Sequence, residues 1–170
     1  MEHDGARPLA APRFFSGGWT LIELSIVVVA AGILALVAVR MYQPKEALAL
    51  EQAERLRDDL RHMQMLAITW GQALRLTTAA GSYSVSCVTA GAAPCNASPV
   101  VDPATGKAYT VNLESGFTLA GPGFTLDLDA LGRPKDGATL RTSNSTFTIS
   151  GASAPRTVVV APLTGFATAQ

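Results

Sequence analysis

The sequence has few of the residue types that carry out chemistry. Its 170 residues include only two histidines and two cysteines. No combination of serine, histidine and aspartate suggests a nucleophilic triad, no glycine-rich loop suggests phosphate binding, and no cluster of ligands suggests a metal site. His3 lies in the first few residues, and His62 lies in a helical pattern where it can cap or pair with Asp58. The sequence therefore indicates a protein that is not an enzyme, with no cofactor and no metal.

Charge is also scarce. Thirteen lysines and arginines balance thirteen aspartates and glutamates, so the formal net charge is zero, and charged residues are sparse after His62. This balance gives no reason to expect binding to nucleic acid or to an anionic surface. The rest of the chain is rich in small and turn-forming residues, which suits the short strands of an exported domain.

The two cysteines, Cys87 and Cys95, are separated by seven residues. This spacing fits neither a redox pair nor a zinc site, which need closer spacing or more ligands. If this part of the chain lies outside the cytoplasm, a disulfide is expected. The alternative is a pair of buried thiols that are not bonded.

One stretch stands out for what it contains. The run from Leu21 to Val39 is almost entirely apolar, and as a helix it would span roughly 28 Å, close to the thickness of a hydrocarbon core. A cleaved signal peptide usually has a shorter apolar part and a small-residue cleavage site after it. A plain membrane anchor explains the length, but it does not explain Glu23, because a carboxylate inside such a helix is costly.

A positive partner would explain Glu23. If the chain is cut between Gly18 and Trp19, the new α-amino group lies four residues before this carboxylate. In a stack of similar helices the amine of one subunit can pair with the carboxylate of its neighbour, where apolar surroundings strengthen the attraction. Such a pair would also set the axial register between subunits.

The segment Gly18-Trp19-Thr20-Leu21-Ile22-Glu23-Leu24 resembles the processing motif of type IV prepilins and type II secretion pseudopilins. The resemblance implies that a prepilin peptidase cuts after Gly18, that Trp19 becomes the N-methylated terminus, and that Glu23 is the assembly residue. Trp19 departs from the phenylalanine usual in the family, but both residues are large and aromatic.

The resemblance also implies three parts. Residues 1–18 would be the leader peptide, residues 19–40 a transmembrane helix in the bacterial inner membrane, and residues 41–170 a periplasmic globular domain. The partners implied are other pilins or pseudopilins, the peptidase, the inner-membrane assembly platform and membrane lipid. After assembly the subunit would belong to the pilus or pseudopilus.

The remainder predicts an α+β fold of the type IV pilin kind, with one long helix from about Trp19 to Trp70 packed on an antiparallel sheet. From Lys45 onward, small and apolar residues recur at spacings of three and four and define one helical face. Pro44 can kink the helix, and Gly71 can end it. The members of the apolar face are Ala49, Ala53, Leu56, Leu60, Met63 and Ala67.

Short alternating segments after Gly71 predict strands. A hairpin is expected around Ala79-Ala80-Gly81, a turn at Gly132 and Pro134, and a loop at 90–106. The other segments expected to form strands are 73–79, 82–88, 108–113, 116–121, 124–129, 138–143, 145–151, 156–162 and 165–169.

The helix end at 55–77 and the strands from 126 to the C-terminus resemble minor pilins and pseudopilins of the GspH/FimT type, and the turn at 130–134 is similar to the MshC-type minor pilin. This implies a structural role as a minor subunit. The residues leave open whether the filament is a type II secretion pseudopilus, a type IV pilus or a haemagglutinin-type pilus.

DNA binding for natural transformation is the alternative, because some FimT-type pilins take part in DNA uptake. It requires basic residues gathered on one surface. Arg133 and Lys135 share a turn, and a small basic patch needs Arg141 and Arg156 beside them. The tail after Arg156 has no basic residue, so nucleic acid is the less favoured partner.

Asp127 and Asp129 alternate along an expected strand, so their side chains share a face. Two carboxylates are few ligands for calcium. We therefore expect a solvated strand face here.

Overall fold

The computed structural model describes residues 20–41, 45–121, 123 and 125–170, and it falls into two units that divide after Tyr42. The leader, Gly18, Trp19 and Pro44 lie outside the described residues. The first described unit contains one helix, α1, and the second contains the helix α2 and all the strands. The predicted long helix is thus described as two helices.

Helix α1 spans Leu21–Met41. It begins after Thr20, whose carbonyl accepts hydrogen bonds from the backbone N–H groups of Glu23 and Leu24, both at 3.1 Å. Counting only residues that the structure describes, no helix is long and apolar enough to cross a membrane.

Helix α2 spans Lys45–Trp70 and buries one face. The predicted apolar face is confirmed, and Gln52 and Leu66 belong to it as well. The helix ends at Gly71, which has a φ of 62°. The N–H of Gln72 donates to the carbonyl of Ala67 at 3.2 Å, a bond typical of a glycine-terminated helix.

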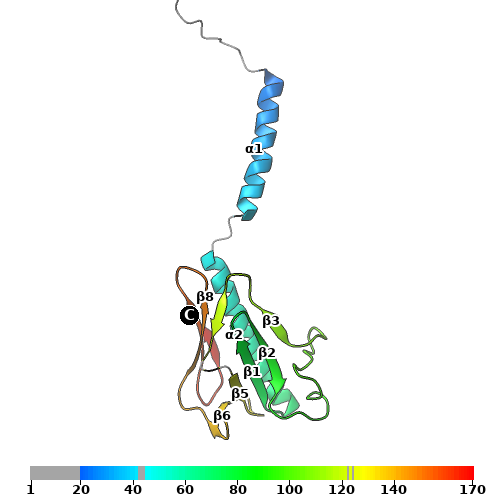
Figure 1. The fold of residues 1–170 in the computed structure, drawn as a ribbon, viewed down its shortest axis with the longest axis vertical. Helices are drawn as coiled ribbons and strands as arrows, with labels where there is room; N and C mark the ends of the chain where they lie inside the picture. The colour runs from blue at the N-terminus through cyan, green and yellow to red at the C-terminus, as the bar shows by residue number, and fades with distance from the viewer. Residues whose placement is uncertain (1–19, 42–44, 122, 124) are drawn as a thin grey trace, which may run out of the picture. The chain divides into compact units, whose positions relative to one another are not determined.

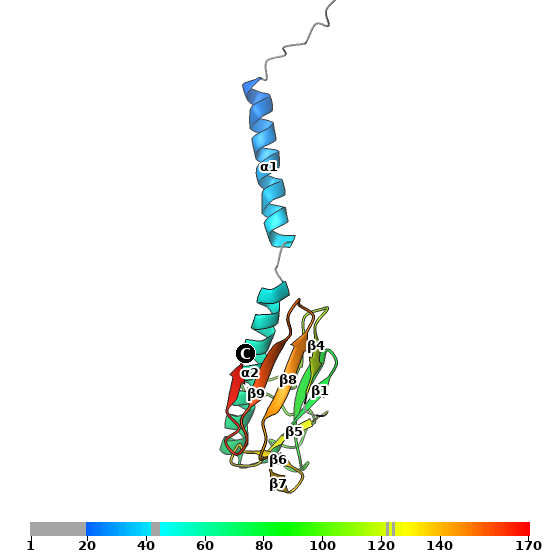
Figure 2. The ribbon, with the colours of Figure 1, turned by 90° about the vertical axis from the view of Figure 1, so that its left-hand side faces the viewer.

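In the described part of the chain, ten strands form two antiparallel sheets (Figures 1 and 2). The six-stranded sheet has the order β3-β2-β1-β5-β6-β7. Its strands are β1 (Leu74–Ala79), β2 (Ser82–Cys87), β3 (Thr110–Asn112), β5 (Thr125–Leu128), β6 (Pro134–Asp136) and β7 (Thr139–Leu140). The predicted hairpin is confirmed, because Ala79 pairs with Ser82 across Ala80 and Gly81.

The second sheet has four strands in the order β10-β9-β8-β4. They are β4 (Thr118–Ala120), β8 (Ser145–Ser150), β9 (Arg156–Val160) and β10 (Ala167–Ala169). The predicted α+β class, with a helix packed on antiparallel strands, is confirmed, but the strands form two sheets and not one. The chain leaves the first sheet at β4, which pairs with the distant β8, and returns to it at β5.

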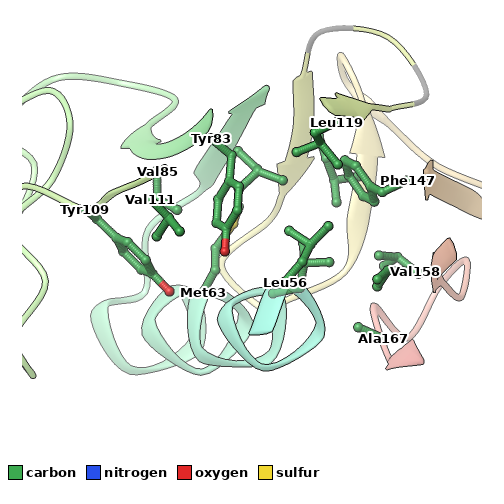
Figure 3. Packing of buried hydrophobic residues seen from close by; sticks show 14 of the residues in the cluster. Leu56, Met63, Tyr83, Val85, Tyr109, Val111, Leu119, Phe147, Val158 and Ala167 are labelled. Carbon is green, nitrogen blue, oxygen red and sulfur yellow. The ribbon is translucent and has the colours of Figure 1, made fainter. Parts of the chain in front are cut away.

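Both sheets and α2 share one hydrophobic core. Leu56 and Met63 of α2 belong to the same buried cluster as Tyr83 and Val85 of one sheet and Phe147 of the other (Figure 3). In β8 the residues Ser145, Phe147 and Ile149 are buried while their neighbours are more exposed, as the two-residue period of a strand requires. The second unit thus has its own core.

Candidate functional site

The start of α1 places Glu23 in its first turn. The backbone N–H of Glu23 donates to Thr20 Oγ1 at 3.3 Å, so the threonine caps the helix. A carboxylate in this turn faces the positive end of the helix dipole. The segment Thr-Leu-Ile-Glu, residues 20–23, also matches the capping-box pattern, which is a sequence signal for the start of a helix. A functional test of Glu23 therefore needs a substitution that also fits the start of a helix.

The side chains of α1 that the structure describes, up to residue 36, are exposed within their own unit. Ten large apolar residues between Leu21 and Leu36 are at least 46 % exposed. They point in every direction around the helix, because they occupy consecutive as well as alternate positions. A helix that is apolar on all sides is stable only inside a larger apolar environment. These residues are Leu21, Ile22, Leu24, Ile26, Val27, Val28, Val29, Ile33, Leu34 and Leu36.

Glu23 is exposed, and no ion pair joins it to any other described residue. The predicted partner, the amine of Trp19, lies outside the described residues. The carboxylate and the apolar surface around it are therefore presented together at the start of α1.

The cysteines form a disulfide between Cys87, at the end of β2, and Cys95, with their Cα atoms 5.5 Å apart. This confirms the prediction of a bonded pair. Two backbone hydrogen bonds shape the enclosed loop: Gly91 N–H donates to the carbonyl of Cys95 at 3.0 Å, and Cys95 N–H donates to that of Ala92 at 2.8 Å. The disulfide ties the start of the long predicted loop to the six-stranded sheet.

A polar cluster around Asp59 joins α2 to the six-stranded sheet. The hydroxyl of Tyr83 donates to the Asp59 carboxylate, and that of Tyr109 donates to Asp59 Oδ1 at 3.3 Å; both phenols point toward α2 (Figure 3). Burial raises the pKa of both tyrosines, and the charge of Asp59 raises it further. Sequence reasoning missed this cluster because its members are 24 and 50 residues apart.

His62 belongs to the edge of this cluster. Its ring packs against that of Tyr109 with centroids 5.8 Å apart, and its Nε2 lies 3.9 Å from Asp102 Oδ1. Of the two possibilities that the sequence offered for His62, the pairing with Asp58 is not the one observed, because Asp58 pairs with Arg57.

Asp127 and Asp129 are held by arginines. Asp127 accepts two hydrogen bonds from Arg75, both at 2.7 Å, and Asp129 accepts from Arg133 Nε at 2.9 Å and from two backbone N–H groups of its turn. Burial alone would raise the pKa of Asp129, but the hydrogen bonds from Arg133 and Leu131 lower it. The expectation of a solvated strand face is therefore wrong. Within the described chain, no group of three or more acidic, histidine or cysteine side chains could hold a metal ion.

Of the four residues considered for DNA contact, Arg133, Lys135 and Arg141 lie close to one another at β6 and β7, and Arg156 lies apart from them. Arg133 is paired with Asp129, and Arg141 donates to Ser145 Oγ at 3.1 Å and to the Lys135 carbonyl at 3.3 Å. Ser145 pairs with Val160, whereas Arg156 pairs with Ile149. Four residues of strand separate the two ends by roughly 13 Å. Arg156 thus lies at the other end of β8 from Arg141.

Comparisons with known proteins give a limited result. No family model matches the chain, and no curated protein matches it. Two crystal structures of the type IV minor pilin FimU of Pseudomonas aeruginosa strain PAO1 are similar to it, both with a TM-score of 0.49. In one the identity is 15 % over 74 % of this chain and 89 % of the other. In the second it is 14 % over 69 % and 89 %.

Proposed function

We propose that the chain is a minor pilin or pseudopilin, a structural subunit of a type IV pilus or a type II secretion pseudopilus. One observation carries the proposal: α1 exposes apolar side chains on all sides with a carboxylate in its first turn, while the second unit has a complete core without it. A helix of this kind has to be buried by other molecules. Packed helices of neighbouring subunits would supply that environment.

The processing motif supports the same function. Cleavage after Gly18 would place a methylated amine on Trp19, four residues before Glu23. In a bundle of such helices the amine of one subunit would meet the Glu23 carboxylate of the next, and this charge pair would fix the axial register. Before assembly, the segment from Leu21 to Val39 would hold the subunit in the inner membrane with residues 41–170 in the periplasm.

The arrangement of the basic residues favours the structural role over DNA binding. A nucleic-acid surface needs several cations that are free to meet phosphates. Of the residues considered, Arg133 is neutralised by Asp129 and Arg156 lies far along β8 from Arg141. We therefore propose no DNA contact for this chain.

Processing gives the first test. We expect Gly18→Val to leave the full-length precursor in the membrane, because a branched side chain blocks the approach of the peptide to the peptidase. Mass spectrometry of wild-type protein from the filament should find N-methyl-Trp19 as the terminal residue. Assembled protein that still begins at Met1 would rule the proposal out.

A further inference from the structure

An exposed apolar patch lies at the end of the second unit where α2 ends. Four residues from three separate segments form it: Ile68 of α2, Leu131 of the turn before β6, and Leu163 and Phe166 between β9 and β10. They are 54 %, 63 %, 53 % and 53 % exposed. Figure 2 shows both connections at the same end of the unit as the end of α2. We call these four residues the terminal patch.

One side chain holds the three segments together. The amide nitrogen of Gln64 donates to the carbonyl of Gly132 at 3.0 Å and to that of Thr164 at 2.6 Å. The backbones also approach closely, because a Cβ added to Gly165 would lie 2.3 Å from the oxygen of Gly132. The terminal patch is therefore a fixed surface and not a set of independent loops.

Leu163 is held in an unfavourable conformation. Its φ is 65°, and among the described residues it is the only one other than glycine with a positive φ. Such a conformation costs free energy in a branched residue, yet the side chain is more than half exposed and gains little burial in return. The side chain of Leu163 is thus held at the surface, where another molecule can bury it.

Arg61 adds a charge to the terminal patch. Its guanidinium lies 4.6 Å from the centre of the Phe166 ring, and its Nε and Nη2 donate to the carbonyl of Ala167 at 3.1 and 2.9 Å. No carboxylate pairs with Arg61 among the described residues. An oriented arginine beside exposed aromatic and aliphatic side chains is typical of the residues that dominate protein–protein binding.

We propose that the terminal patch is the docking surface for a neighbouring filament subunit of different sequence, one that presents aliphatic side chains beside a carboxylate. The carboxylate would meet Arg61, which pairs with no carboxylate among the described residues, and the aliphatic groups would cover Leu163, Leu131 and Phe166. This inference rests on the proposed function, since a minor subunit is flanked by subunits of other sequence. Duplex DNA fits poorly, because the nearby Arg133 is already neutralised by Asp129.

Photo-crosslinking in the bacterium tests the inference on the full chain. A benzophenone amino acid replaces Leu163 in one variant and Leu131 in another, and the adducts are identified by mass spectrometry. We expect both to give an adduct with a second pilin-type subunit. Arg61→Glu should lower the yield about tenfold, as for loss of a central interface residue, whereas Arg61→Lys should keep part of it. Leu50→Gln, which changes an exposed leucine elsewhere on α2, is the matched control and should have no effect.

The other outcomes overturn the inference. One such outcome is that neither position gives a protein adduct although the chain still enters the filament. Another is that the adducts contain phospholipid, DNA or a second copy of this chain. An adduct yield that Arg61→Glu leaves unchanged also overturns it. Failure of the proposed function would look different, because the wild-type chain would then be missing from the filament and Glu23→Ala would change nothing.

Discussion

Helices α1 and α2 differ in where their apolar residues lie. In α2 the apolar residues recur at spacings of three and four and lie against the two sheets, with Ala49, Leu56 and Met63 fully buried. In α1 they occupy every side, and each one whose side chain is described is exposed. Helix α2 is therefore stabilised by its own domain, whereas the described residues of the first unit leave the apolar side chains of α1 exposed.

The largest expected difference in the free energy of unfolding is between a leucine of α2 and a leucine of α1. We expect Leu56→Ala to lower the free energy of unfolding of the second unit by about 2–5 kcal/mol, because it leaves a cavity in the shared core. Leu34→Ala in α1 should change it by no more than about 0.5 kcal/mol. Amide hydrogen exchange of β1 and β2 in the detergent-solubilised full chain measures both. A large loss from Leu34→Ala would show that α1 belongs to the core after all.

The disulfide should be next in size. Replacing Cys87 and Cys95 together by alanine should cost about 2–3 kcal/mol, the chain-entropy estimate for so short a loop. Reduction of the wild type is the control and should cause the same loss. Thiol alkylation of the unfolded, unreduced protein should label neither cysteine. Labelling of both would mean that the bond does not form in the cell.

An effect of similar or slightly smaller size is expected at the contact between α2 and the six-stranded sheet. Tyr83→Phe removes a hydrogen bond to a charged group and should cost about 1.5–3 kcal/mol. Tyr109→Phe is the matched control and should cost less, because its bonds to Asp59 are 3.3 Å long. Equal losses from the two variants would contradict this ranking of the bonds.

The same tyrosines predict a dependence on pH. Their pKa values are raised in the folded chain above the ordinary value of 10.0, so the unfolded chain releases these protons first. The stability that they contribute is complete below about pH 10 and is lost as the pH rises above it. Unfolding measured from pH 8 to pH 11 should show this decline, and Tyr83→Phe should make it shallower.

Local pattern predicted much of the fold. The buried face of α2, its end at Gly71 and nine of the strands follow from period and turn residues. Strand β6 was missed because Pro134 reads as part of a turn, and only the pairing of Lys135 with Asp127 and Leu140 makes it a strand. The division into two sheets was also missed, since it depends on β4 pairing with β8 across a long stretch of chain.

The candidate sites also differ in whether their sequence signals are local. The start of α1 and the disulfide were predictable because their signals are local. The Asp59 cluster and the arginine partners of Asp127 and Asp129 were not. The Arg75–Asp127 pair joins residues 52 positions apart, and no local pattern identifies such a partner. The terminal patch could not be predicted for the same reason, because three separate segments of the chain form it.

The proposal that α1 is buried by neighbouring subunits is tested most directly at Glu23. Filament incorporation of wild type, Glu23→Gln and Glu23→Asp, measured by co-purification with sheared filaments at matched expression, separates the effect of its charge from that of its place at the start of α1. Glutamine also serves in a capping box, so Glu23→Gln keeps the start of α1 but removes the charge. We predict that Glu23→Gln is cleaved after Gly18 and anchored normally yet fails to enter the filament, while Glu23→Asp is intermediate. Incorporation of Glu23→Gln at the wild-type level would contradict assembly through a charge pair.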